Sequence, residues 1–135
     1  MIRARLLAAL LLAWVTGILF PMYSVTRVDP ACRGAFDWVF HTEASHVIMH
    51  TFLYGMLATL LYAVMPKRIG ASALPLAASV MAGIIAVAML QEAIQMVCTR
   101  SPLGPDEFFD LFVDINGAIL GLMLSIRPGR ARASR

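Results

Sequence analysis

The sequence predicts an all-α integral membrane protein, a bundle of four transmembrane helices with both termini in the cytoplasm. Two observations predict this fold: 60% of the 135 residues are hydrophobic, and these residues gather in four long runs. Each run approaches or exceeds the ~20 residues that a helix needs to cross a hydrocarbon core about 30 Å thick. There is no Gly/Ser-rich linker and no repeat, so we expect one small domain. We expect no nucleic-acid partner for this membrane protein.

The transmembrane domain is predicted to cover residues 1–126, and a short basic cytoplasmic tail over residues 127–135 follows. The first run is longer than the ~7–15 apolar residues of a signal peptide, and no small-x-small cleavage site closes it. The last run is long enough only if its two aspartates are included. The four predicted spans are residues 6–25, 46–65, 72–98 and 108–126.

Basic residues are distributed unequally between the two sides of these spans. Lys and Arg accumulate in the cytoplasmic segments of membrane proteins. With four spans, one side of the membrane receives the N-terminus, the loop after the second span and the C-terminus. These segments hold eight of the eleven basic residues and no acidic residue. The bias predicts that both termini are cytoplasmic. The eight residues are Arg3, Arg5, Lys67, Arg68, Arg127, Arg130, Arg132 and Arg135.

Polar residues in the last three spans fall on one helix face each, near the outer side of the membrane. An ionisable side chain in hydrocarbon costs roughly 2.5–3.5 kcal/mol at a helix centre, so we expect these faces to turn inward and form one site. The two glycines of the last span also predict close helix packing. The faces comprise His46, His50 and Tyr54, then Glu92, Gln95 and Thr99, and finally Asp110, Asp114, Gly117 and Gly121.

Three kinds of chemistry could use such a site. The acids could pair with His50 and Arg100 and only hold the helices together. The site could instead bind a charged or hydroxylated lipid head group. It could also hold a divalent metal, because His-x-x-x-His puts two imidazoles on one face and carboxylates complete an N/O set suited to zinc. We expect no other cofactor. The candidate metal ligands are His46, His50, Glu92, Asp110 and Asp114.

Nine residues in and between the last three predicted spans form a sequence pattern. They are His50, Tyr54, Glu92, Gln95, Arg100, Asp110, Gly117, Ala118 and Gly121. This order resembles the VanZ-like family of small integral membrane proteins. The family pattern runs His-Phe-x-x-Tyr, Glu-x-x-Gln, Arg and then Asp-x-x-x-Asn-x-x-Gly-Ala-x-x-Gly, and the resemblance covers residues 46–126. This chain departs from it with Thr51 in place of Phe, with Asp114 in place of Asn, and with His46 where Asp is common.

The resemblance implies a multi-pass protein of the bacterial cytoplasmic (inner) membrane with a role in the cell envelope. Its partners would be membrane lipids and a lipid-linked cell-wall or glycan component that the polar site recognises. The family's namesake is associated with resistance to the glycopeptide teicoplanin, so a link to such resistance is one expectation. The residues that we expect to form this binding site are His50, Tyr54, Glu92, Gln95, Arg100, Asp110 and Asp114.

We expect a binding protein rather than an enzyme, and two alternatives stay open. The first is a membrane enzyme, metal-dependent or not, that acts on a lipid or a lipid-linked glycan. Its catalytic candidates are Glu92 or Asp110 as the general base and His50 as the partner of that base. The second alternative is a structural or assembly subunit whose charged residues meet another membrane protein. The sequence leaves the oligomeric state open.

The two cysteines, Cys32 and Cys98, are both predicted to face the oxidising side of the membrane. A disulfide between them would tie the first outer loop over the polar site, and two free thiols are the alternative. The same loop carries aromatic residues at positions 36, 38 and 40. Such residues indicate an interfacial anchor or a lid along the head-group layer.

Overall fold

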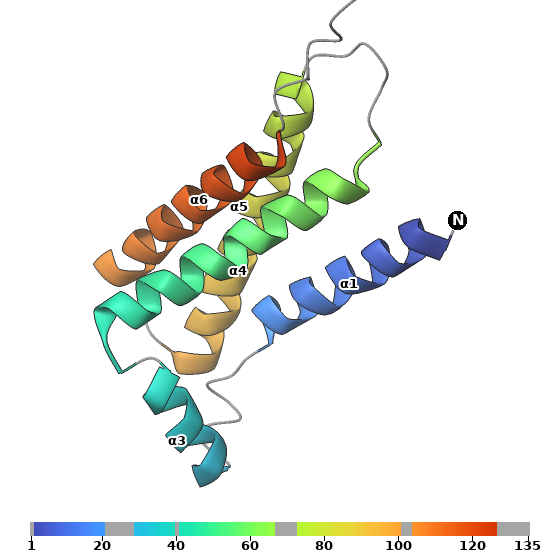
Figure 1. Ribbon diagram of the computed structural model, residues 1–135. Helices are drawn as coiled ribbons and strands as arrows, with labels where there is room; N and C mark the ends of the chain where they lie inside the picture. Colours follow the sequence, from blue (N-terminus) through green and yellow to red (C-terminus); the bar gives the residue numbers. More distant parts are fainter. Residues whose placement is uncertain (1, 21–28, 40, 67–72, 101–103, 127–135) are drawn as a thin grey trace, which may run out of the picture.

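The structure, a computed structural model, describes residues 2–20, 29–39, 41–66, 73–100 and 104–126. In these ranges all regular structure is α-helical, as the sequence predicts. Four of the helices are long and apolar enough to cross a membrane, which makes the chain a multi-pass membrane protein. The predicted basic tail lies outside the described residues. The helices are α1 (Ile2–Leu19), α3 (Pro30–Val39), α4 (Glu43–Val64), α5 (Ala73–Thr99) and α6 (Pro105–Ser125), drawn in Figure 1.

The helix starts follow local capping signals. Thr42 caps α4, because its hydroxyl accepts a hydrogen bond from the Ser45 backbone N–H at 3.0 Å, and α4 therefore begins three residues before the predicted span. α6 begins at Pro105, which needs no hydrogen-bonded N–H in the first turn. The Glu107 carboxylate in that turn accepts from the backbone N–H of Gly104 at 2.7 Å.

The predicted first span is displaced along the chain. α1 begins at Ile2 rather than at residue 6, so its first turns include Arg3 and Arg5. Arginines can lie at the end of a membrane helix because their long side chains place the charged heads in the interface. It ends at Leu19, and the predicted end at residue 25 lies outside the described residues.

α3 is a short helix in the segment that we predicted only as an aromatic loop. Asp29 caps it, because its carboxylate accepts from the Ala31 N–H at 2.9 Å and its backbone carbonyl accepts from the Arg33 N–H at 3.0 Å. Figure 1 shows α3 at the end of the bundle where α4 and α6 begin. Trp38 is exposed on this helix. The question of an anchor or a lid therefore concerns a helix rather than an irregular loop.

α4 and α6 lie side by side and run in the same direction (Figure 1). Their backbones touch: a Cβ added to Gly117 would lie 2.6 Å from the carbonyl oxygen of Thr51, and one added to Gly121 would overlap the carbonyl group of Gly55. Glycine is thus required for this approach. We call this contact the α4–α6 seam. It is formed by His46, His50, Thr51, Gly55 and Thr59 of α4 and by Asp110, Asp114, Gly117, Gly121 and Ser125 of α6.

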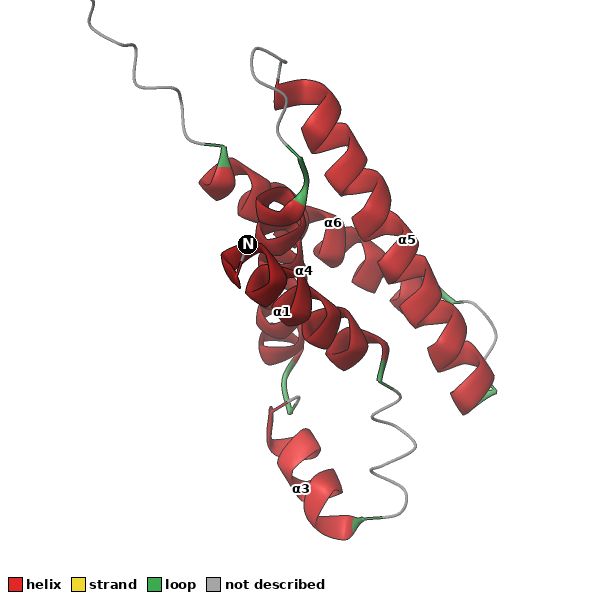
Figure 2. Ribbon diagram, turned by 90° about the vertical axis from the view of Figure 1, so that its right-hand side faces the viewer, coloured by secondary structure: helices red, strands yellow, loops and turns green. Residues whose placement is uncertain are grey.

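α5 crosses the α4–α6 pair at an angle, as Figures 1 and 2 show together. It supplies a stripe of fully buried residues, Val80, Ile84 and Ala88, that packs with Tyr54 and other residues of α4. α1 packs on α4 and α5, with Ile18 as its one buried residue in the described part of the chain. The core therefore lies between α4, α5 and α6, and α1 covers part of it.

Candidate functional site

Five titratable residues of the three core helices meet at the end of the bundle where α4 and α6 begin. We call them the polar cluster: His46, His50, Glu92, Asp110 and Asp114. Its centre is the buried pair of His50 and Asp114, whose Nδ1 and Oδ1 atoms lie 2.8 Å apart. At this distance the ring N–H donates to the carboxylate. The two side chains are 9% and 0% exposed, so this pair lies within the helix packing.

A second pair lies one helical turn nearer the end of the bundle. His46 Nε2 is 2.8 Å from Asp110 Oδ1, and the two side chains are 35% and 13% exposed. The rings of His46 and His50 stack, with their centroids 4.3 Å apart. Both pairs join residues 64 positions apart, so a single parallel register of α4 and α6 produces them both.

Glu92 is the contribution of α5 to the polar cluster. It is only 7% exposed, and neither of its carboxylate oxygens has a hydrogen-bond partner among the described residues. It is close enough to interact electrostatically with Asp110, Asp114 and His50. Asp114 Oδ2 is likewise a buried acceptor without a partner in the described chain. Buried polar atoms are normally hydrogen-bonded, so these three oxygens have unmet hydrogen-bonding capacity.

Two predicted binding residues lie away from the polar cluster. Gln95 and Arg100 are exposed, whereas Tyr54 is fully buried and donates to Gln91 Oε1 at 2.7 Å. The crossing angle of α5 explains this difference, because its last turns leave the core. Gln91 was missed from the sequence. The buried stripe of α5 advances in four-residue steps, and its continuation passes through Gln91 and Glu92 rather than Gln95.

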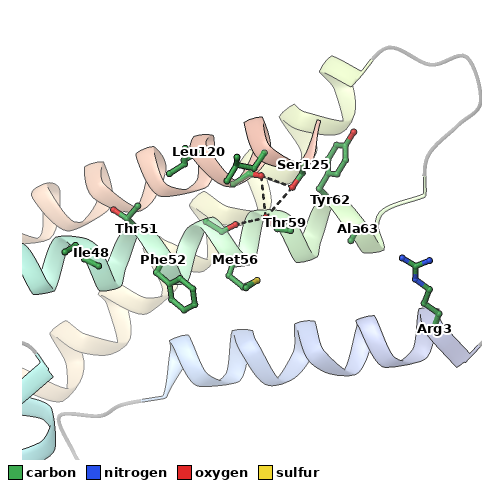
Figure 3. A pocket seen from close by; sticks show the side chains of 13 residues that line it. Arg3, Ile48, Thr51, Phe52, Met56, Thr59, Tyr62, Ala63, Leu120 and Ser125 are labelled. Atoms are coloured by element: carbon green, nitrogen blue, oxygen red, sulfur yellow. Dashed lines mark hydrogen bonds between the residues drawn. The ribbon is translucent and has the colours of Figure 1, made fainter. Parts of the chain in front are cut away.

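A groove of about 920 Å³ lies beside the polar cluster, between α1 and the α4–α6 pair (Figure 3). Its walls are mainly apolar, and Thr51, Thr59 and Ser125 contribute hydroxyls. No residue of the polar cluster lines it, but its first α4 residues, Ile48 and Thr51, share the helical turns of His46 and His50. We call it the lateral groove. Arg3 lies at its other end in Figure 3.

Both cysteines are free, so the structure contains no Cys32–Cys98 disulfide. The Cys32 thiol instead donates to the Asp29 carboxylate at 3.4 Å. The physical reason is the position of α3, which carries Cys32 and lies apart from the last turn of α5, which carries Cys98 (Figure 2).

The predicted metal ligands are brought together only in part. One ligand atom each of His46, His50 and Asp110 lies within 4.8 Å of the other two. Glu92 and Asp114 are not members of this set, although Asp114 hydrogen-bonds one of its histidines.

No protein-family model, no curated protein and no solved structure matches this chain. Arguments about its function therefore rest on its own residues and their geometry.

Proposed function

We propose that this chain is a bacterial inner-membrane protein of the VanZ-like type whose polar cluster binds a lipid-linked cell-wall or glycan component. The observation that carries the proposal is the convergence of His50, Glu92 and Asp110, three residues of the pattern that resembles this family, from three different helices. Gly117 and Gly121 of the same pattern lie in the seam that positions this end. Motif residues that only filled a core would not leave buried carboxylate oxygens unpaired.

The chemistry of the cluster favours hydroxyl and amino groups over phosphate. It holds three carboxylates and two histidines, and its buried atoms that lack a partner among the described residues are all carboxylate oxygens. Sugar hydroxyls and ammonium groups donate to carboxylates, whereas a phosphate would be repelled. The ligand group is therefore the sugar or amine part of a lipid-linked glycan, and its phosphate lies outside the cluster.

The lateral groove supports a ligand with a hydrocarbon chain. It begins on the α4 turns that carry His46 and His50, and it continues along α4 towards Arg3. A lipid-linked ligand would place its polar group at the cluster and part of its chain in this groove. Most of the groove lining is apolar, which suits such a chain.

The charge bias supports an orientation with both termini in the cytoplasm, which opens the polar cluster to the outer leaflet. A reporter enzyme fused after Arg135 should then be cytoplasmic, and one inserted after Gly104 should be external. An external C-terminus would contradict this orientation.

A membrane enzyme is the second candidate, and Glu92 is the observation that favours it. A buried carboxylate without a partner can accept a proton from a bound substrate as a general base. Turnover of a lipid-linked glycan that is lost in Glu92→Gln, with ligand binding retained, would establish the enzyme. Saturable binding without any product would leave the binding protein.

The proposal is tested by binding in lipid nanodiscs. A polyprenyl phosphate that carries a sugar should bind the wild-type protein more tightly than the same polyprenyl phosphate without the sugar. Asp110→Asn should weaken binding by about 10-fold or more, as expected when a charged hydrogen bond of about 1.5–3 kcal/mol is lost. Asp106→Asn is the matched control, because Asp106 is an exposed acid in the first turn of the same helix.

The groove is tested with bulky substitutions. Met56→Trp fills it and should weaken binding of the lipid-linked ligand, whereas Met123→Trp places the same ring on an exposed position outside the groove. Equal binding of both polyprenyl phosphates, or equal affinity of Asp110→Asn and Asp106→Asn, would contradict the proposed function. Susceptibility of cells with and without the gene to teicoplanin tests the link to glycopeptide resistance separately.

A further inference from the structure

We propose that the polar cluster binds a divalent transition-metal ion, with His46, His50 and Asp110 as its protein ligands and a fourth position that faces Glu92. The inference deepens the proposed function and rests on it, because it concerns the same site. It assigns separate roles to residues that otherwise form only a charged group.

The three ligands come from two helices whose relative position is fixed by backbone contact. Their ligand atoms already lie within 4.8 Å of one another. Ligand atoms about 2.0–2.2 Å from one tetrahedral ion are about 3.3 Å apart. The 2.8 Å contact between His46 Nε2 and Asp110 Oδ1 would therefore have to open by about 0.5 Å to admit the ion. The partial exposure of His46 leaves room for this adjustment.

Asp114 orients His50 for this task. Its carboxylate accepts a hydrogen bond from Nδ1 of the ring, so the lone pair of Nε2 is left for a metal ion. Metal-binding histidines commonly donate their second N–H to a carboxylate in this way.

Glu92 supplies the independent observation that points to a ligand. Its carboxylate is buried and has no hydrogen-bond partner in the described part of the chain, and it interacts electrostatically with His50 and Asp110. It lies outside the 4.8 Å set, so we do not count it as a ligand. We assign it the role of accepting a hydrogen bond from a water molecule or a substrate hydroxyl in the fourth position. Three protein ligands and one open position are typical of zinc sites that act on a bound molecule.

The donor set selects the class of metal. Two imidazole nitrogens and one carboxylate oxygen suit Zn²⁺ and similar first-row ions, whereas Ca²⁺ and Mg²⁺ prefer sites made of oxygen atoms alone. We therefore expect Zn²⁺ and Co²⁺ to bind and millimolar Mg²⁺ not to compete.

The test is a Zn²⁺ titration of the full-length protein in detergent against a chromophoric chelator. Wild-type protein should bind about one ion per chain, and His50→Gln should lose more than about 100-fold in affinity. Asp114→Asn should lose about 10–100-fold, because it removes only the residue that orients His50. The matched controls are His41→Gln, which changes an exposed histidine that contacts the Trp38 carbonyl, and Asp106→Asn. Both controls should retain wild-type affinity.

A second measurement does not depend on the folding of a variant. Co²⁺ bound to the wild-type protein should give the visible absorption of a four-coordinate site with N and O ligands, and Zn²⁺ should displace it. Absence of this spectrum, or equal Zn²⁺ affinity of wild type and a folded His46→Gln/His50→Gln variant, would overturn the metal site. Glycan binding that persists in excess chelator, with no bound Zn²⁺, would reject the metal and leave the proposed function standing. Zn²⁺ binding without glycan binding would reject the proposed function and leave the metal site standing.

Discussion

The α4–α6 seam and the contact of α1 with the rest of the bundle are two different ways of packing membrane helices. In the seam the backbones touch where Gly121 meets Gly55, so no Cβ can be added to Gly121. α1 instead buries Ile18 and donates one hydrogen bond, from Trp14 Nε1 to the Leu53 carbonyl at 3.0 Å. A groove remains between α1 and the seam. Lipid does not drive apolar helices together, so close packing and hydrogen bonds decide which contacts are tight.

This difference shows why the charged residues lie where they do. His50 and Asp114 need a fixed separation to satisfy each other in a buried place, and the seam provides it. The looser α1 contact borders the lateral groove, which has space for the ligand that we propose. The α4–α6 pair thus fixes the positions of the charged side chains, and the looser packing of α1 leaves the groove open.

The largest effect is expected from Gly121→Val. The new side chain would overlap the backbone of α4, which must move away, and we expect a loss of several kcal/mol in the free energy of unfolding. Gly17→Val is the matched control in α1, since a Cβ at Gly17 meets nothing within 4 Å. Thermal unfolding in detergent measures both. If Gly121→Val melts at the wild-type temperature, the seam is not as close as described.

The two His–Asp pairs should differ in strength. Asp114→Asn weakens a buried pair and should cost about 3–5 kcal/mol, whereas Asp110→Asn weakens a partly exposed pair and should cost about 1 kcal/mol or less. The double change of Asp114→Asn with His50→Gln should cost less than the sum of its parts. Unfolding of each variant in detergent gives the comparison. Strict additivity would show that His50 and Asp114 do not meet.

The hydrogen bond of α1 should contribute a smaller amount. Trp14→Phe removes the indole N–H that donates to Leu53 and keeps an aromatic ring next to Phe52, so the expected loss is about 1 kcal/mol. Trp38→Phe is the control, because Trp38 is exposed on α3. If the Trp14→Phe protein is as stable as the control, the hydrogen bond from Trp14 to Leu53 does not stabilise the contact of α1.

The smallest effect concerns α3 and changes reactivity rather than stability. Asp29 accepts a hydrogen bond from the Cys32 thiol, and this bond and the nearby negative charge raise the pKa of the thiol. Asp29→Asn should therefore lower that pKa, while an amide still caps the helix. The pH profile of maleimide labelling at Cys32 should move to lower pH. Asp37→Asn in the same helix should leave the labelling profile unchanged. Identical profiles for the wild type and both variants would refute the hydrogen bond between Cys32 and Asp29.

Periodicity within each segment was enough to predict four apolar helices and the inward faces of α4 and α6. It also predicted a close helix contact at Gly117 and Gly121. The start of α3 could have been read from Asp29-Pro30, an N-cap residue followed by proline in the first turn. The aromatic residues that follow this two-residue signal indicated an interfacial loop instead.

The pairing of His50 with Asp114 was not predictable in the same way. Spacing places both aspartates on one face of α6, but the partner of each histidine depends on the register between two helices. That register follows from backbone contact at the glycines. The choice of Gln91 over Gln95 follows from the angle at which α5 crosses, and the four-residue spacing of the buried stripe on α5 was the signal that could have revealed it.

The central claim is that the buried charges form a site rather than a scaffold, and Glu92→Gln tests it most directly. Because neither carboxylate oxygen of Glu92 has a partner among the described residues, the neutral amide should leave the melting temperature in detergent unchanged or raise it. Binding or turnover of the sugar-bearing polyprenyl phosphate should fall at least about 10-fold in the same preparation. A variant that melts near the wild-type temperature or above it and has lost this function is the result that we predict. A variant that handles the ligand as wild type does, or loses function only in step with stability, would contradict the claim.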